Sequence, residues 1–383
     1  MERKDASIVI STILFYNTVG TISIALQLLF AGRVSDFLIA LLTSVYWLLL
    51  LIFSVIWSFL ADNLGRRKEI LCLTNLSMGV VILAFLLFQD YTSAFIIRAL
   101  MGIFSGAYLP IALAILLDDT PKEKLGRKSS LFNISRSLGF LFSSYMTTIL
   151  LLIFDVQSLF IFSSLAVSTT ALLISLIKTS RKKEVRRIEL KVPGKGFIRN
   201  NNAHLLVIAL TLRHINIMGI ISLIFVYMIS KGIPDYLVGF ISSFNLLMQI
   251  VLMYPFGYLA DKVGRKPIFL LGFLFSIIVP LAFYSAENVW EFSISFALIG
   301  ISFSALISGT SPFLRDIAPP GRESEALSFL NVARGIGSVI GPMLVGYVAT
   351  YFGYNTMFIV ISIISTIGFI LSLFVKETLR SRI

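Results

Sequence analysis

SFLADNLGRRK at residues 58–68 and GYLADKVGRKP at residues 257–267 decide how this chain folds, because the two stretches are near copies. Their aspartates, Asp62 and Asp261, lie 199 residues apart. The pattern Asn-x-x-Arg-x-x-Gly also occurs twice, at residues 133–139 and 331–337, with an offset of 198 residues. The chain is therefore built from two copies of one unit.

Long apolar segments flank both copies and continue to either end of the chain. Lipid offers no water to backbone amides, so segments of about 20 residues or more must cross a membrane as helices. We predict an all-α membrane protein with twelve transmembrane helices in two pseudo-symmetric six-helix bundles. The predicted spans are residues 8–30, 37–60, 70–89, 93–117, 129–154, 158–177, 203–229, 236–260, 267–286, 289–313, 326–351 and 356–375.

The composition independently favours a membrane protein. Hydrophobic residues make up 57% of the chain, charged residues 14%, and the mean hydropathy is +0.91, whereas soluble domains have about 25% charged residues. The net charge of +12 lies in short loops beside the spans, where anionic lipid headgroups are the nearest partner, so we expect no nucleic-acid partner. The single cysteine, Cys72, excludes an internal disulfide framework, and no metal site is expected.

Basic residues lie on one side of the predicted spans. The odd-numbered connections between spans contain only Arg33 and Lys231, whereas the even-numbered connections and both tails are strongly basic. Positive loops stay in the cytoplasm during insertion. We therefore predict a multi-pass protein of the cell membrane with both termini cytoplasmic.

One polar, basic segment divides the repeats. We predict an N-terminal six-helix bundle at residues 1–178, a cytoplasmic linker at residues 179–202 and a C-terminal six-helix bundle at residues 203–383. The basic linker is interpreted either as a solvated segment held to anionic lipid or as a regulatory lipid switch. A pair of six-span repeats is how many secondary transporters are built, with the substrate site at the repeat interface.

The motifs on these repeats resemble those of the major facilitator superfamily. The stretch at residues 257–266 is similar to the loop that this family has between spans two and three and again between spans eight and nine. The family's span-four motif is resembled by RALMG at residues 98–102. Its span-eleven motif is resembled by GSVIGPMLVG at residues 337–346. This resemblance implies the fold of that family and transport by alternating access. Ser58 departs from the family glycine, and GFLFSSY at residues 139–145 lacks the Gly-Pro of proton-driven drug antiporters.

The repeated loop is interpreted as a conformational latch. A carboxylate there can accept hydrogen bonds from free amides at a helix N-terminus, and the resemblance places Asp62 and Asp261 against helix starts of the opposite half. We expect Arg66 to pair with Asp118 and Arg265 with Asp316. In the alternative interpretation the basic pairs only hold the topology. The predicted latch comprises Asp62, Gly65, Arg66, Asp118 and Arg136 in the first repeat, and Asp261, Gly264, Arg265, Asp316 and Arg334 in the second.

Two arginines inside predicted spans occur in one repeat only. Arg98 has Phe296 at its repeat position, and Arg213 has Phe15. A cation at membrane depth costs several kcal/mol unless it faces protein or water, and no acidic residue lies near the middle of a predicted span. We therefore predict that both arginines bind an anionic substrate. The alternative is that they donate hydrogen bonds to backbone carbonyls or cap a broken helix.

Other polar residues in the spans are candidates for the same site. A carboxamide is costly to leave unsatisfied in lipid, and His214 could titrate near neutral pH and couple protons, although a hydrogen-bonded or lipid-facing histidine is the alternative. No cofactor is predicted. The candidate substrate-binding residues are Asn17, Tyr46, Arg98, Arg213, His214, Asn245 and Gln249.

These features predict a secondary active or facilitative transporter for a small organic solute, with an organic anion favoured. A multidrug/proton efflux antiporter and a sugar transporter are the alternatives, and a non-transporting membrane sensor is a different class. No paired buried carboxylates, metal-ligand cluster or phosphate-binding loop indicates an enzyme. A monomer suffices for the predicted mechanism.

Overall fold

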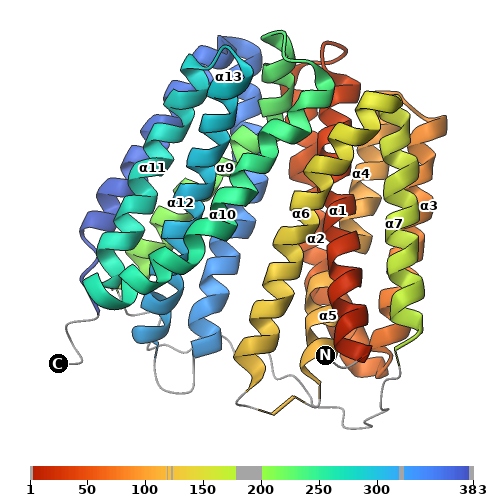
Figure 1. Ribbon diagram of the computed structural model, residues 1–383, viewed down its shortest axis with the longest axis horizontal. Helices are drawn as coiled ribbons and strands as arrows, with labels where there is room; N and C mark the ends of the chain where they lie inside the picture. The colour runs from red at the N-terminus through yellow and green to blue at the C-terminus, as the bar shows by residue number, and fades with distance from the viewer. Residues whose placement is uncertain (1–2, 119, 122–123, 178–200, 319–322, 379–383) are drawn as a thin grey trace. The chain divides into compact units, whose positions relative to one another are not determined.

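The computed structural model describes residues 3–118, 120–121, 124–177, 201–318 and 323–378. These residues form helices and no strands (Figure 1). The helices are α1 (Arg3–Phe30), α2 (Asp36–Leu64), α3 (Arg67–Leu87), α4 (Tyr91–Ser105), α5 (Tyr108–Leu117), α6 (Leu125–Ile153), α7 (Val156–Ser175), α9 (Asn201–Ser230), α10 (Asp235–Val263), α11 (Arg265–Ser285), α12 (Val289–Asp316) and α13 (Glu323–Leu373).

The described helices account for the twelve predicted spans. Eleven candidates are long and apolar enough to cross a membrane, and the last of them, Leu330–Leu373, has 44 residues. Gly353 interrupts it with a left-handed φ of 81°, which a glycine adopts without steric cost, so α13 consists of two helices and supplies two spans. The predicted fourth span is divided between α4 and α5 at Gly106 and Ala107. Most of the predicted linker, residues 179–200, lies outside the described residues.

Contacts between Cα atoms divide the chain into two compact units. The first unit comprises Met1–Val34, Val45–Glu189 and Val238–Phe240. In it α1 packs against α6 and α7, and α3 packs against α7 and α4. Helix α1 is more buried than α2: 67% of the residues in the most apolar stretch of α1 are buried, against 28% in that of α2. An ion pair between Asp5 and Lys128, 2.9 Å long, joins α1 to α6.

The second unit comprises Ser35–Ser44, Leu190–Leu237 and Ile241–Ile383. In it α9 packs along α13, and α11 along α12. Buried Asn216 joins three of these helices, because its Nδ2 donates to the carbonyl of Ser276 at 2.8 Å and to Oγ of Ser365. The core around α9 includes Ala203, Leu206, Ala209, Leu210, Phe269, Phe273, Leu306, Phe313, Leu314, Leu330, Ala333 and Val375.

The segment Ser35–Ser44, which begins α2, packs on α13 within the second unit. The amide of Phe37 donates to Oγ1 of Thr350 at 2.8 Å, and Tyr354 Oη donates to Oδ1 of Asp36 at 2.8 Å. Gly346 lies so close to this segment that an added Cβ would be 2.6 Å from Cβ of Ala40. This packing explains why the compact units differ from a simple division of the sequence into halves.

The repeat seen in the sequence is also present in the packing. A Cβ added to Gly139 on α6 would lie 2.8 Å from Cβ of Tyr16 on α1. A Cβ added to Gly337 on α13 would lie 2.6 Å from Cβ of His214 on α9. Only a residue without a side chain permits this approach of helix backbones, so both units use one contact, and Tyr16 and His214 are equivalent positions.

Candidate functional site

Arg98 is enclosed in the first unit. Its side chain, on α4, is 1% exposed, and its guanidinium carbon lies 4.1 Å from the ring centre of Tyr46. Nη2 donates to Oγ of Ser23 at 3.1 Å, while Nε and Nη1 are buried with no hydrogen-bond partner. Among the described residues no carboxylate pairs with this cation, so it retains donors for a further acceptor.

Arg213 occupies a comparable environment in the second unit. It is 5% exposed on α9; Nη2 donates to Oγ of Ser302 at the long distance of 3.5 Å, and Nε is buried without a partner. Arg213, His214 and Arg334 line one small pocket. The residues lining this pocket include no acidic side chain.

The other candidates lie in separate places. In the first unit Asn17 is buried near Thr21, whose Oγ1 donates to Asn17 Oδ1 at 3.5 Å, and Tyr46 stacks on Arg98. In the second unit Gln249 Nε2 donates to Oδ1 of Asn245 at 2.8 Å. The structure thus brings Tyr46 to Arg98, His214 to Arg213 and Gln249 to Asn245.

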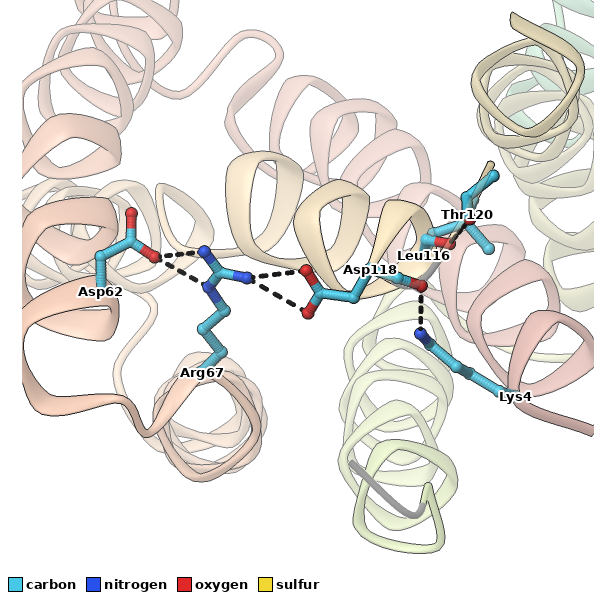
Figure 2. Close-up of polar contacts among 6 residues, drawn as sticks. All are labelled: Lys4, Asp62, Arg67, Leu116, Asp118 and Thr120. Carbon is cyan, nitrogen blue, oxygen red and sulfur yellow. Dashed lines mark hydrogen bonds and ion pairs between the residues drawn. The ribbon is translucent and has the colours of Figure 1, made fainter. Parts of the chain in front are cut away.

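A chain of ion pairs follows the repeated loop in the first unit. Figure 2 shows Arg67, at the start of α3, between two carboxylates. Its Nε donates to Oδ1 of Asp62 at 2.7 Å, and its Nη1 donates to both carboxylate oxygens of Asp118 at 3.0 and 3.1 Å. The expected partner Arg66 is exposed, so the prediction that Arg66 pairs with Asp118 is wrong by one residue.

The second unit has the same arrangement around Arg265. This arginine pairs with Asp261, and its Nε lies 3.5 Å from Oδ2 of Asp316. By sequence Arg265 corresponds to Arg66, but it is the first residue of α11, as Arg67 is the first of α3. The turn after α2 has two residues, Gly65 and Arg66, whereas Gly264 alone separates α10 from α11. The bridging arginine is therefore the one that begins the helix.

Both turns depend on glycine. Gly65 has φ of 60° and Gly264 has φ of 122°, and side-chain-bearing residues rarely adopt these values. The turn thus sets where the next helix begins and which basic side chain reaches the aspartates.

Two contacts of these clusters were not predicted. Glu377 accepts hydrogen bonds from the amides of Arg265 and Lys266 at 3.1 and 2.8 Å, and so caps α11. In the first unit Lys4 Nζ donates to the carbonyl of Asp118 at 3.0 Å (Figure 2). The first acidic residue after the last apolar span was the available signal for Glu377, whereas nothing in the spacing distinguishes Lys4 from other basic residues near the termini.

The remaining two predicted latch residues lie elsewhere in their units. Arg136 on α6 lies over the ring of Tyr16, with its guanidinium carbon 4.9 Å from the ring centre, and Arg334 lines the pocket of Arg213. Within the described ranges no group of three or more histidine, cysteine, aspartate or glutamate residues could hold a metal ion.

Comparison with known proteins identifies the family. A sequence model of the Major Facilitator Superfamily matches residues 8–241 and 206–383. The multi-drug resistance efflux pump PmrA of Streptococcus pneumoniae is 26% identical over 318 residues, covering 80% of this chain and 78% of that protein. The multidrug resistance protein MdtG of Enterobacter lignolyticus is 22% identical over 332 residues, covering 85% of this chain and 79% of that protein.

Solved structures share the fold. The nucleoside transporter NupG matches with a TM-score of 0.82 at 12% identity, covering 97% of this chain and 98% of that one. A bacterial homolog of the human lysosomal transporter Spinster matches with a TM-score of 0.81 at 13% identity, covering 97% and 96%. With twelve spans, duplicated signature loops and a family match along nearly its whole length, this chain belongs to the major facilitator superfamily of membrane transporters.

Proposed function

We propose that this chain is a secondary transporter that moves a small organic anion across the membrane by alternating access, with Arg98 and Arg213 binding the substrate. The observation that carries the proposal is the pair of buried guanidinium groups. Neither forms an ion pair with a described residue, and each keeps a buried nitrogen without a hydrogen-bond partner. A carboxylate supplies both the opposite charge and the acceptors that a planar guanidinium needs.

Five polar residues are proposed to accompany these arginines. Tyr46 supports Arg98 by stacking, which fixes the guanidinium plane. Gln249 and Asn245 already bond to each other, so together they present one orientation of their amides to a substrate. Asn17 and His214 complete the proposed set, and a change in the charge of His214 would couple transport to protons.

Uptake into proteoliposomes tests the proposal. Purified protein is offered an aromatic carboxylate, a neutral aromatic of similar size and a cationic dye. We expect carboxylate uptake, reduced about 10- to 100-fold in Arg213→Gln, because a charged hydrogen bond contributes about 1.5–3 kcal/mol. Lys231→Gln, which removes an exposed cation after α9, is the control and should leave uptake unchanged. Equal uptake by wild type and Arg213→Gln would overturn the proposal.

Multidrug efflux is a second candidate, favoured by the names of relatives such as PmrA and MdtG. The two candidates differ in the charge of the substrate. In inside-out vesicles a multidrug pump should accumulate cationic dyes when a proton gradient is imposed, whereas a site built on buried arginines disfavours cations. Dye accumulation that is insensitive to Arg98→Gln and Arg213→Gln would favour multidrug efflux over the anion transporter.

The ion-pair chains Asp62–Arg67–Asp118 and Asp261–Arg265–Asp316 are proposed as the latch of the transport cycle. We also propose that both termini face the cytoplasm, where the basic loops meet anionic headgroups. Residues 179–202 are proposed to link the bundles at residues 1–178 and 203–383. A monomer is proposed to be the transporting unit. Reporter proteins fused to each terminus and to the loop at Arg33 test the orientation: activity of a cytoplasmic reporter at the loop alone would refute it.

A further inference from the structure

The pocket of the second unit has an unusual lining for a membrane-embedded hollow. Arg213, His214 and Arg334 supply its polar wall, and Phe303, Leu330 and Thr310 contribute to the rest. Arg213 is 5% exposed, and its Nε is buried without a hydrogen-bond partner. Two guanidinium groups that line one hollow favour an anion there.

The first unit shows that this hollow is not a general consequence of the fold. At the positions equivalent to Arg213 and His214 it has Phe15 and Tyr16. Phe15 stacks on Tyr108 with ring centres 3.9 Å apart. Arg136, the counterpart of Arg334, lies over the Tyr16 ring. Aromatic rings therefore fill the first unit at this place and support its arginine.

Three replacements open the same place in the second unit. Arg213 stands for Phe15, His214 for Tyr16, and Leu306 for Tyr108, each 198 residues later. Leu306 lines the pocket and is smaller than a tyrosine. The replacements remove ring volume and add nitrogen donors, which is the change that a site for a compact anion requires.

We infer that Arg213, His214 and Arg334 form a binding site for an oxyanion, a carboxylate or phosphate group, inside the second unit. This inference rests on the proposed function and deepens it. It assigns Arg334 to substrate recognition and places the anionic group of the substrate in the pocket of the second unit. The anion would accept hydrogen bonds from the Arg213 guanidinium, while Arg334 and His214 supply further donors. Its source could be the transported substrate, free phosphate or a lipid headgroup.

Binding of radiolabelled inorganic phosphate to the full-length protein tests the site. The protein is held in phosphatidylcholine nanodiscs, and bound phosphate is measured by equilibrium dialysis with chloride holding the ionic strength constant. We expect one saturable site that Arg213→Gln and Arg334→Gln each weaken by about tenfold or more. His214→Tyr, which restores the residue of the first unit, should also weaken binding by filling the hollow. Arg136→Gln is the matched control and should bind as wild type does.

Further arms identify the source of the anion. Competition by an aromatic carboxylate would indicate the transported substrate, no competition would indicate phosphate itself, and loss of phosphate binding in phosphatidylglycerol nanodiscs would indicate a headgroup. Each of these outcomes supports the site. Absence of saturable binding by wild type, or equal binding by wild type, Arg213→Gln and Arg334→Gln, would overturn it.

The phosphate-binding and carboxylate-uptake experiments together distinguish failure of the oxyanion site from failure of the proposed function. Phosphate binding that depends on Arg213 and Arg334, without any carboxylate uptake into proteoliposomes, would retain the site and refute anion transport. Carboxylate uptake that Arg98→Gln and Arg213→Gln both reduce, with no saturable phosphate binding by wild type, would retain anion transport and refute the site.

Discussion

The two units agree in a close helix contact and in an arginine that bridges two aspartates, and they differ in their buried charges. Gly139 and Gly337 make the same close helix contact, and Arg67 and Arg265 bridge equivalent pairs of aspartates. Yet Arg98 has a phenylalanine, Phe296, at its repeat position. The helix contact and the bridging ion pairs are thus common to the two copies, whereas the buried groups that we propose to bind a substrate are particular to each.

The phenylalanine positions show what a unit contains without a guanidinium. Phe296 packs against Phe225 and Phe283, with ring centres 6.1 and 5.2 Å away. These rings need no hydrogen-bond partner, so packing alone accounts for the side chain at position 296. Arg98 at the equivalent position stacks on Tyr46, but two of its buried nitrogens have no hydrogen-bond partner. Packing alone therefore does not satisfy this side chain as it satisfies Phe296.

Arg98→Phe would copy the second unit into the first and should have the largest effect. It removes the guanidinium while keeping a large side chain. We expect the protein to fold and carboxylate uptake to fall about 10- to 100-fold, the equivalent of about 1.5–3 kcal/mol for a charged hydrogen bond. Proteoliposome uptake measures this, and elution as a single species on size exclusion checks the fold. Phe296→Leu is the control, and uptake by Arg98→Phe within about twofold of wild type would refute a binding role for Arg98.

The ion-pair chain of the first unit offers the next test, because it contains adjacent arginines in different positions. Arg67→Gln leaves Asp62 and Asp118 without their bridging cation, whereas Arg66→Gln removes an exposed charge. Partly exposed pairs contribute about 0.2–1 kcal/mol each, so we expect the uptake rate to change about two- to fivefold in Arg67→Gln. Arg66→Gln should behave as wild type. Equal effects of the two changes would show that the positive charge of the loop matters and the bridge does not.

Much of the fold could be predicted from sequence because apolar length and duplication are one-dimensional signals. The spans follow from runs such as residues 37–60, and the break inside α13 coincides with the gap predicted between residues 351 and 356. The partner of Asp118 could not be predicted, since it depends on whether a turn has one residue or two. A shift by one residue in a helix rotates the side chain by about 100°, which separates Arg66 from Arg67.

The candidate site was predicted only as separate residues. An arginine within an apolar span indicates a functional group wherever it occurs, so Arg98 and Arg213 were identifiable. The association of Arg334 with Arg213 was not, because it depends on the pocket formed between α9, α12 and α13. From its sequence Arg334 was predicted to belong to the latch, as was its counterpart Arg136, yet the two arginines have different surroundings.

The helix cap supplied by Glu377 should have a smaller effect. Its carboxylate accepts from two amides at the start of α11, where a negative charge is favoured by about 0.3–1 kcal/mol. Glu377→Gln should lower the melting temperature by about 0.4–1.2 °C. Lys376→Gln changes the exposed neighbouring residue and is the control. An unchanged melting temperature in Glu377→Gln would show that the neutral amide serves as well as the carboxylate.

The smallest expected effect lies at the cap of the fourth span, where the units again differ in charge. Asp90 caps α4 by accepting from the amide of Ser93 at 2.9 Å, and its counterpart Asn288 caps α12 by accepting from two amides. The hydrogen bond from the Ser93 amide lowers the pKa of the exposed Asp90 carboxyl. Because the folded-state pKa is below the unfolded value of about 3.9, the ionised cap stabilises the fold above that value, and the contribution is lost as pH falls through the folded-state pKa.

A neutral cap has no such dependence on pH, and this difference makes the effect measurable although it is small. Asp90→Asn copies the second unit, and its amide oxygen can accept the same hydrogen bond whether the solution is at pH 7 or at about pH 3. The melting temperature of wild type should therefore fall toward that of Asp90→Ala on acidification, while the difference between Asp90→Asn and Asp90→Ala stays constant. Parallel melting curves for wild type and Asp90→Asn across this pH range would show that the charge of Asp90 adds nothing to its hydrogen bond.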